Sequence, residues 1–469
     1  MTRKTISIIA SLAALALLIV GYLYIVPAWM KAHPRRSPYE IDYSLYPESP
    51  KLTSFDANKL NRIENFDEGF ALVREGNSWR LQSAHLPVDK IKIDQGMILN
   101  RLWSVSNVWA DAIVDENPED LSVYGLDDPS GRVLLGDSDG NTVEFIFGNL
   151  TPSHNSIYLM LAGDPNIYII STYTLEYLYF TLDSVRDKDI FDEMNLNAIM
   201  RLVIEPRPDD PYGKGTIDIG RRSNNDFMIN QFTGFTLNAP YSSKYGANAD
   251  RFSDMLEALT YLDIIEFVDD DPVSLAPYGL DRPGRLYVET MDGRLEIVYG
   301  RGENGIRFAR LNGEGSVFTI WGLEPVISVT PFTLLDKFAL IFMIDNVDSF
   351  TVTGDGRTVS ATVNGIGDDA IFHLDGKKAE DKAFRVFYQA VIGLLIDAEL
   401  NGPELRGEGT DWIVEYKLNT PRGATASIRL IPYNRDFFIL EKEGAREFLI
   451  SRNQARRIFE LADTMVYID

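Results

Sequence analysis

The stretch Tyr124-Gly-Leu-Asp-Asp-Pro129 decides the fold, because it returns later in the chain as Tyr278-Gly-Leu-Asp-Arg-Pro283. After each copy the sequence predicts the same order of elements: strand, turn, strand, turn, strand and then a helical segment. A motif that recurs at the same place in a longer pattern indicates an internal repeat. The chain is therefore expected to contain at least two copies of one structural unit.

Each residue type in this motif suits a tight turn between a helix and a strand. Glycine adopts positive φ, aspartate accepts hydrogen bonds from the backbone two residues on, and proline fixes the entry to the next strand. We expect Tyr124 and Leu126 to pack under the turn and to hold the helix against the sheet. The functional alternative is that two exposed Tyr–Asp pairs form binding sites. Turn chemistry is sufficient to explain the motif and is the preferred interpretation.

The length of 469 residues suggests about three domains. The predicted fold class is α+β: an N-terminal transmembrane helix followed by three related repeats, each an antiparallel β meander with helices packed on one face. The third unit keeps the order of elements but has Asn401-Gly-Pro-Glu-Leu405 in place of the motif. The predicted parts are a transmembrane anchor (1–30), a proline-rich stalk (31–51), repeat unit 1 (52–195), repeat unit 2 (196–345) and a degenerate repeat unit 3 (346–469).

Helices are predicted where apolar residues recur at helical spacing. In the first unit Ile98, Leu102, Val105 and Trp109 have this spacing, and a tryptophan there is expected in the core rather than as a platform for a ligand. Each unit is expected to close with a helix. These closing helices are Thr172–Phe191, Phe332–Phe342 with Pro331 at its start, and Arg452–Ala462.

Charge and composition exclude several classes of function. There are 45 Lys and Arg against 69 Asp and Glu, a net charge of −24, so nucleic-acid binding is not expected. The chain has no cysteine, which excludes disulfides, a thiol nucleophile and thiolate metal sites. Its four histidines form no close pair, so neither a metal nor a cofactor is expected. They are His33, His85, His154 and His373.

An apolar stretch near the N-terminus predicts a membrane anchor. No charged residue lies from Thr5 to Met30, and Ile6–Val26 is almost continuously apolar. At about 1.5 Å per residue this run spans the hydrocarbon of a lipid bilayer. A cleaved signal peptide is the alternative, but its apolar region has about 7–15 residues, and Pro27-Ala-Trp29 is a poor cleavage site. We expect a single-pass protein of the cell membrane with its N-terminus in the cytoplasm, since long domains translocate largely regardless of charge.

The motif, the iterated strand order and the single N-terminal anchor resemble the bacterial domain-of-unknown-function family numbered 4340. The resemblance covers most of the soluble chain and is specific over Tyr124–Phe147 and Tyr278–Gly300, whereas the third unit departs from it by lacking the motif. It implies an envelope protein of the kind often encoded beside an ABC transporter and its gliding-motility-type auxiliary component. It implies no catalytic residues.

Two local motifs suggest ligand sites but are better explained as turns. Gly300-Arg-Gly-Glu-Asn-Gly305 has the spacing of a dinucleotide loop, yet Ile306–Arg310 alternates like a strand where that site needs a helix. Asp137-Ser-Asp-Gly-Asn141 suggests a calcium loop, but the glycine and the glutamate that such a loop needs are missing. The second unit has Asp292-Gly293 at the same turn, which is hairpin chemistry.

The sequence assigns no catalytic, cofactor-binding or metal-binding residue. The acidic runs Asp115-Glu116 and Asp269-Asp-Asp271 are interpreted as solvated segments. The preferred function is a non-catalytic, membrane-anchored envelope protein that acts as a scaffold or accessory component in a membrane complex with ABC transporter components. Two alternatives stay open. One is an extracytoplasmic hydrolase or glycan-modifying enzyme that uses paired carboxylates, and the other is a ligand-binding or sensory module.

Overall fold

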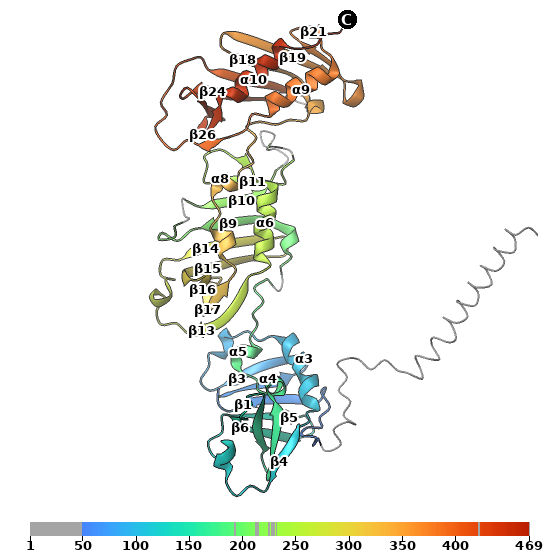
Figure 1. The fold of residues 1–469 in the computed structure, drawn as a ribbon, viewed down its shortest axis with the longest axis vertical. Helices are drawn as coiled ribbons and strands as arrows, with labels where there is room; N and C mark the ends of the chain where they lie inside the picture. The colour runs from blue at the N-terminus through green and yellow to red at the C-terminus, as the bar shows by residue number, and fades with distance from the viewer. Residues whose placement is uncertain are drawn as a thin grey trace, which may run out of the picture. The chain divides into compact units, whose positions relative to one another are not determined.

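The computed structural model describes residues 49–191, 194–211, 215–223, 226, 230, 232–420 and 423–468. The predicted anchor over Ile6–Val26 and nearly all of the predicted stalk (31–51) lie outside these residues. Within the described ranges, no helix has both the length and the apolar character that a membrane crossing requires. Three antiparallel sheets and a few helices make up the described fold (Figure 1).

The first sheet has eight strands in the order β3-β2-β1-β5-β6-β7-β8-β4. Strands β1 and β5 pair at the centre of this sheet. One meander runs outward from β1 through β2 to β3, and the other runs from β5 through β6 and β7 to β8. Strand β4 pairs with β8 and forms the edge of the sheet on that side. Its elements are β1 (Leu60–Asn65), β2 (Phe70–Glu75), β3 (Ser78–Ser83), α3 (Gln95–Ser106), β4 (Ala112–Glu116), the 3₁₀ turn η4 (Leu121–Tyr124), β5 (Gly131–Asp137), β6 (Thr142–Leu150), β7 (Ser156–Leu161), β8 (Asn166–Ser171) and α4 (Thr172–Leu178).

The second sheet has nine strands in the order β12-β11-β10-β9-β14-β15-β16-β17-β13. Strands β9 and β14 take the central places of β1 and β5, and β13 takes the edge place of β4. Its elements are β9 (Ile199–Glu205), β10 (Ile217–Arg221), β11 (Phe235–Ala239), β12 (Tyr245–Gly246), α6 (Ala249–Leu259), β13 (Asp263–Asp269), η6 (Ala276–Tyr278), β14 (Gly284–Thr290), β15 (Arg294–Glu303), β16 (Ile306–Leu311), β17 (Glu314–Trp321), α7 (Glu324–Ile327) and α8 (Pro331–Leu334).

The third sheet has nine strands in the order β21-β20-β19-β18-β23-β24-β25-β26-β22, which is the same connectivity again. Although this unit lacks the motif, its strand order confirms a third related repeat and an α+β fold. Its elements are β18 (Val347–Gly354), β19 (Arg357–Asn364), β20 (Ile371–Leu374), β21 (Lys377–Lys378), α9 (Asp381–Ile392), β22 (Ala398–Glu399), β23 (Trp412–Leu418), β24 (Thr425–Pro432), β25 (Phe437–Lys442), β26 (Ala445–Ser451) and α10 (Arg452–Asp463).

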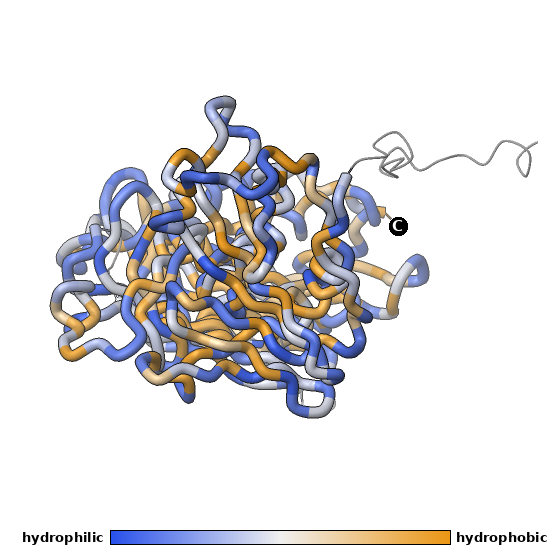
Figure 2. Tube along the Cα trace, turned by 90° about the horizontal axis from the view of Figure 1, so that it is seen from below, coloured by the Kyte–Doolittle hydropathy of each residue, from blue (hydrophilic) through white to orange (hydrophobic). Residues whose placement is uncertain are grey.

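Alternation of apolar and polar residues determines which face of each sheet is covered. In β23 the side chains of Trp412, Val414 and Tyr416 are buried, whereas Glu415 and Lys417 are exposed. A strand with one buried face alternates in this way. Helices α9 and α10 lie on one face of this sheet (Figure 1), and their buried side chains belong to the same hydrophobic cluster as Trp412, Val414 and Tyr416. Hydrophilic residues gather in the peripheral loops, and apolar residues lie mostly inside (Figure 2).

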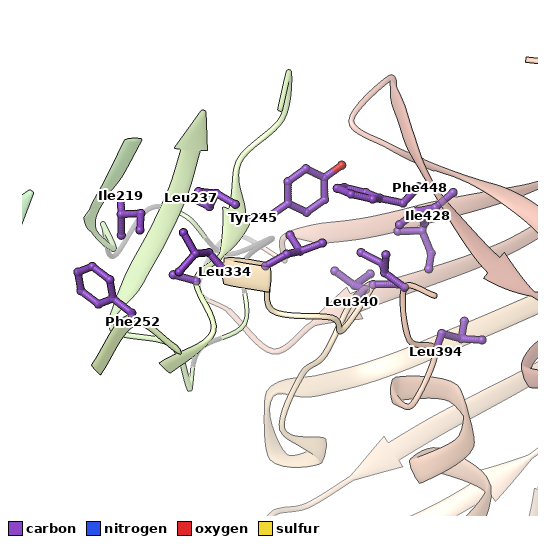
Figure 3. Close-up of a cluster of buried hydrophobic side chains, with 14 of the residues drawn as sticks. Ile219, Leu237, Tyr245, Phe252, Leu334, Leu340, Leu394, Ile428 and Phe448 are labelled. Atoms are coloured by element: carbon purple, nitrogen blue, oxygen red, sulfur yellow. The ribbon is translucent and has the colours of Figure 1, made fainter. Parts of the chain in front are cut away.

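The three sheets form two compact units. Among the described residues, one unit comprises 49–82 and 95–181, and the other comprises 83–94 and everything from Leu182 onward. The second unit holds two sheets because their buried side chains form one continuous hydrophobic cluster. Tyr245 of β12 and Phe448 of β26 meet edge to face with ring centres 5.0 Å apart, and Leu334 and Leu340 continue the cluster between the sheets (Figure 3).

The closing helix of the first unit is shorter than predicted. The predicted helix Thr172–Phe191 is wrong after Leu178, where α4 ends, and the chain returns to a helix only over α5 (Leu182–Val185). Phe180, which lies between these helices, is fully buried. Its place in the core is therefore reached without a continuous helix, because tertiary packing outweighs local propensity.

The predicted closing helix of the second repeat is also too long. Pro331 begins α8 as predicted, but the helix ends at Leu334. Beyond it, Leu335 and Phe338 form isolated β-bridges with Ala247 and Leu395. The apolar residues after Leu334 have the spacing of a helix. The chain is nevertheless extended there, because it pairs with two distant segments. In the third repeat the predicted closing helix is confirmed as α10.

Candidate functional site

The repeated motif forms the same turn in both units. Tyr124 ends η4 and Tyr278 ends η6, and the glycine that follows each has a φ of 69°. Glycine adopts this left-handed conformation without strain. Leu126 and Leu280 are buried, and each donates its backbone N–H to a 3₁₀-turn carbonyl at 3.1 Å. The predicted positive-φ turn with a buried leucine is therefore confirmed.

The motif tyrosines contact aspartates that the sequence did not link to them. The Tyr124 hydroxyl donates to Asp115 Oδ2 at 2.8 Å, and the Tyr278 hydroxyl donates to Asp269 Oδ2 at 2.9 Å. Each hydrogen bond raises the pKa of its tyrosine, since the phenolic proton is held by a carboxylate. The two aspartates lie in β4 and β13, so each bond ties the turn to the edge strand of its sheet.

This arrangement corrects two expectations about the acidic residues. Within the described residues the motif aspartates, Asp127 and Asp281, accept no hydrogen bond, so the predicted backbone role for them is wrong. Asp115 and Asp269 were expected to be solvated but are half-buried hydrogen-bond acceptors. The equal spacing from aspartate to tyrosine in both repeats is the signal that could have revealed these pairs.

A glycine in the second strand after the turn, Gly148 in β6 and Gly300 in β15, leaves room for the motif. A Cβ atom on Gly148 would lie 2.2 Å from the carbonyl oxygen of Tyr124, and one on Gly300 would lie 2.1 Å from that of Tyr278. The pairing of β15 with β16 changes register beside Gly300, as at a β-bulge. The strand predicted after Gly305 is confirmed as β16, so these glycines shape a bulge and a turn rather than a dinucleotide loop.

The loop that resembles a calcium site is a hairpin turn. Asp137 Oδ1 accepts the backbone N–H groups of Asp139 and Asn141 at 3.0 and 2.9 Å. The Asp139 carboxylate pairs with Lys59 at 2.6 Å. The Asp137 carboxylate thus holds the turn itself, and the Asp139 carboxylate joins it to Lys59, which directly precedes β1. Throughout the described part of the chain, no group of three or more histidine, aspartate or glutamate side chains has a geometry for a metal ion.

A charged cavity of about 690 Å³ lies in the second compact unit, and the buried Arg186 lines it. The guanidinium stacks on Phe267, 3.5 Å from the ring centre, and its Nη2 lies 2.7 Å from both Asp270 Oδ1 and Ser316 Oγ. Asp270, which was expected to be solvated, is therefore the partner of a buried cation. Burial alone would raise the pKa of the Asp270 carboxyl. The hydrogen bonds from Arg186 and Ser316 and the charge of Arg186 outweigh burial and lower this pKa.

A second buried arginine organises the turn between β9 and β10. Arg307 Nε donates to Glu324 Oε1 at 2.6 Å, and its Nη1 donates to Asp210 Oδ1 at 3.0 Å. The other carboxylate oxygen of Glu324 is buried with no partner among the described residues. The three side chains form a compact ion-pair cluster, in which both carboxylates are committed to one guanidinium.

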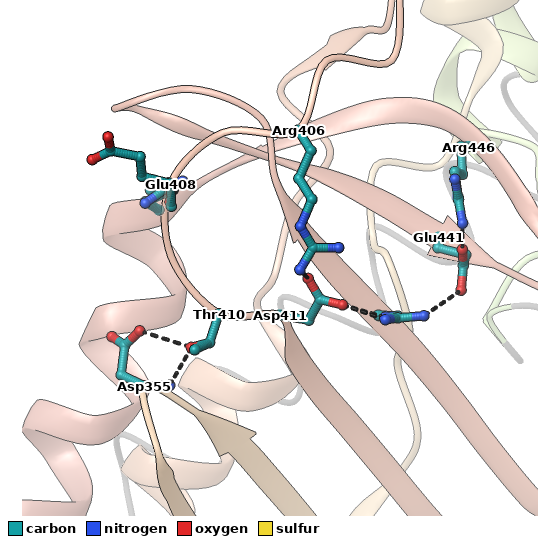
Figure 4. A network of polar contacts seen from close by, with 9 residues as sticks. Asp355, Arg406, Glu408, Thr410, Asp411, Glu441 and Arg446 are labelled. Carbon is teal, nitrogen blue, oxygen red and sulfur yellow. Dashed lines mark hydrogen bonds and ion pairs between the residues drawn. The ribbon is translucent and has the colours of Figure 1, made fainter.

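In the third unit an ion-pair network takes the place of the motif. Asp411 accepts from Arg406 at 2.8 Å and from Arg429 at 2.7 Å. Farther along the sheet, Glu441 pairs with Arg446 at 2.6 Å (Figure 4). The two bonds to Asp411 hold the loop that leads into β23, and Arg446 also donates to Glu404 of that loop at 3.0 Å. The loop is thus fixed by charge where the other repeats use a Tyr-Gly-Leu-Asp turn.

The first unit contains a cavity of about 690 Å³, called the aromatic cavity below, which is lined by Trp109, Tyr173 and Tyr177. One wall is the loop between α3 and β4. Thr53 fixes this loop, because its Oγ1 donates to the Val105 carbonyl at 2.9 Å and accepts the Val108 N–H at 2.7 Å. Trp109 was predicted on the face of a helix and in the core, and both expectations are wrong: α3 ends at Ser106, and the residue is 36% exposed and lines the cavity.

Helix α4 also lines the cavity and contributes two tyrosines. Ser171 caps this helix by accepting the Thr174 N–H at 3.1 Å. The rings of Tyr173 and Tyr177 meet edge to face with centres 5.0 Å apart, and their hydroxyls are hydrogen-bonded at 2.8 Å. Tyr173 is 65% exposed and Trp109 is 36% exposed, so part of each side chain is accessible, and Lys51 Nζ lies 5.7 Å from the centre of the Trp109 ring. Two tyrosines one helical turn apart on an exposed face are the signal that sequence reasoning overlooked.

Polar side chains complete the aromatic cavity. Among its described lining residues Asp111 alone carries a charge, and Ser104, Asn107, Ser171 and Thr174 supply hydroxyl and amide groups. Partial burial raises the pKa of the Asp111 carboxyl. Glycoside hydrolysis requires two carboxyl groups facing one bond. The described lining thus combines aromatic rings, hydroxyl and amide groups and one carboxyl group.

Comparison with known proteins identifies a family whose function is unknown. The family model described as "Domain of unknown function (DUF4340)" matches residues 79–283 and 238–391. No curated protein and no solved structure matches the chain. The matched ranges include both copies of the motif, together with strands and helices of all three repeats.

Proposed function

The chain belongs to the DUF4340 family of unknown function, and we propose that it is a non-catalytic, membrane-anchored envelope protein that serves as a scaffold or accessory component of an ABC-type transport system. The apolar run Ile6–Val26 supplies the anchor, with the N-terminus in the cytoplasm and the repeats outside. The transport partner is taken from the family resemblance. Among the described residues, one structural feature supports a role in protein binding above the others.

That feature is the apolar surface of two equivalent edge strands. Strands β4 and β13 end their sheets, and the Tyr–Asp bonds make Asp115 and Asp269 equivalent positions. The residue before each is a valine with nearly the same exposure, 42% for Val114 and 43% for Val268. An edge strand with exposed apolar side chains is a surface to which another chain adds by backbone pairing. Two repeats thus offer the same kind of docking edge.

The carboxylates support binding over catalysis. Asp210 and Glu324 share one arginine, and Asp411 lies between two. Each of these carboxylates accepts charge-assisted hydrogen bonds from arginine, which fix its orientation. These half-buried acids are therefore suited to holding loops in place.

Copurification tests this proposal. The full-length protein carrying a C-terminal affinity tag is cross-linked in its native membranes, extracted in mild detergent, purified and examined by mass spectrometry. We expect the ATPase or the permease of an ABC transporter to be enriched over a mock purification. A chain without residues 1–30 is the control, and it should be released from the membrane fraction. Recovery of the tagged protein without any transporter component would refute the proposal.

A further inference from the structure

We propose that the aromatic cavity of the first repeat binds a neutral oligosaccharide. A sugar ring has an apolar C–H face and a rim of hydroxyl groups, so its site needs flat rings together with a few placed hydrogen-bonding groups. The cavity offers both: Trp109, Tyr173 and Tyr177 supply ring surface, and Asn107 and Asp111 supply hydrogen-bond partners from the same loop as Trp109. This role is separate from the scaffold function and does not depend on it.

The charge of the lining selects the class of ligand. The described residues that line the cavity include no lysine or arginine. The Lys51 ammonium lies 5.7 Å from the centre of the Trp109 ring and donates to Ser54 Oγ at 3.2 Å. Phosphate and carboxylate ligands are held by cations that line their sites. The chain also carries a net charge of −24, which repels anions. Asp111 accepts hydrogen bonds from hydroxyl groups without requiring a cation. A neutral polyhydroxylated ligand fits this combination better than a nucleotide or an acidic peptide does.

The volume and the rigidity of the site agree with this assignment. Ligand pockets span about 300–1,000 Å³, and the cavity, at about 690 Å³, falls inside that range. Both walls are fixed before any ligand arrives, because Thr53 holds the loop that carries Trp109 and Ser171 caps the helix that carries Tyr173. A preformed site binds without a large ordering cost.

The test is titration of the detergent-solubilised full-length protein with neutral tetrasaccharides built from glucose, mannose or N-acetylglucosamine. Binding is followed by calorimetry and by tryptophan fluorescence. We expect at least one tetrasaccharide to bind saturably, and we expect both Trp109→Ala and Tyr173→Ala to weaken that binding about tenfold or more. Tyr173→Phe, which keeps the ring, should retain most of the affinity. Unchanged circular dichroism and melting temperature establish that the variants fold.

The matched control is Trp103→Ala, because Trp103 is 68% exposed on α3 and does not line the cavity. This variant should bind like the wild type. The proposal is overturned if no tetrasaccharide binds at about 10 mM, which would leave the cavity to another part of the chain or to a protein partner. It is equally overturned if Trp103→Ala weakens binding as much as Trp109→Ala does. Copurification of the Trp109→Ala variant with the transporter keeps this test separate from that of the scaffold function.

Discussion

The hydroxyl of Tyr278 donates a hydrogen bond to Asp269, 2.9 Å away, and so joins the motif turn to the edge strand β13. The same bond joins Tyr124 to Asp115 in the first repeat at 2.8 Å. In both repeats it spans the loop between the edge strand and the first strand of the second meander. The motif therefore stabilises the return of the chain from the edge of the sheet to its centre.

Tyr278→Phe should loosen this return without unfolding the repeat. The variant keeps the ring, which packs on Phe308 with centres 5.2 Å apart, and loses only the bond to Asp269. Hydrogen exchange measured by mass spectrometry should show faster exchange in the peptide that contains Gly279 and Leu280. Tyr287→Phe, at a tyrosine outside the turn, should leave exchange in that peptide unchanged. Equal exchange in both variants would contradict the role given to the motif.

Gly300→Ala should destabilise the second compact unit by about 1–3 kcal/mol, because the new methyl group overpacks the turn. Its Cβ would lie 2.1 Å from the Tyr278 carbonyl oxygen, and backbone atoms cannot easily move away. Gly293→Ala is the control, since a Cβ there meets nothing within 4 Å. Urea unfolding followed by fluorescence measures both. A wild-type unfolding midpoint for Gly300→Ala would show that the bulge does not need glycine.

Because the amine of Lys442 is buried, we expect the free energy of unfolding to rise with pH. This side chain is 3% exposed, and burial lowers its pKa to about 8, against about 10.4 in the unfolded chain. Below about pH 8 the amine is charged in both states, so the folded state bears the cost of the buried charge. As the pH rises from about 8 toward 10.4, the folded protein releases this proton first. The free energy of unfolding should therefore increase, by an amount on the order of 2 kcal/mol.

Lys442→Met tests this assignment. Three groups influence the amine: Asp336 and Glu443 raise its pKa, and the Tyr245 ring lies 5.0 Å from Nζ. The variant should be more stable than the wild type at pH 7, by an amount on the order of 2 kcal/mol, and should gain less stability between pH 8 and 10. Melting curves across this range measure the difference. Parallel pH profiles for the two proteins would exclude Lys442 as the source.

Asp411→Asn should loosen the loop before β23 and cost about 1 kcal/mol or less, because Arg406 and Arg429 are partly exposed. The loss should shrink in about 1 M salt, which screens such pairs. Asp348→Asn, at an exposed carboxylate 3.9 Å from Lys417, is the control and should be neutral. Denaturant unfolding at low and high salt distinguishes the two. A salt-independent loss would indicate packing rather than ion pairing.

Much of the fold could be predicted because its signals are local. Alternating residues indicated the strands, and Asp-Gly turns such as Asp292-Gly293 indicated the hairpins. The return of β4 and β13 to the far edge could not be predicted, because it depends on pairing with β8 and β17, which come much later in the chain. The end of α8 at Leu334 escaped prediction for the same reason, since bridges to Ala247 and Leu395 extend the chain there.

The candidate site was missed because its geometry is set by distant contacts. The spacing from Ile98 to Trp109 is helical, but Thr53 binds the backbone on either side of the end of α3 and turns the chain. Trp109 therefore lies beyond the helix and lines the same cavity as Tyr173 and Tyr177. No pattern within one segment reveals that three aromatic residues from two segments share one space.

Site-specific photo-cross-linking in native membranes tests the scaffold proposal most directly. A photoreactive amino acid is placed at Val114 or Val268, and in a control at Val386, which is 43% exposed on α9. The proposal predicts adducts between the two edge-strand positions and an ABC transporter component, with no such adduct from Val386. Absence of transporter adducts from Val114 and Val268, while the protein remains folded and in the membrane, would contradict it.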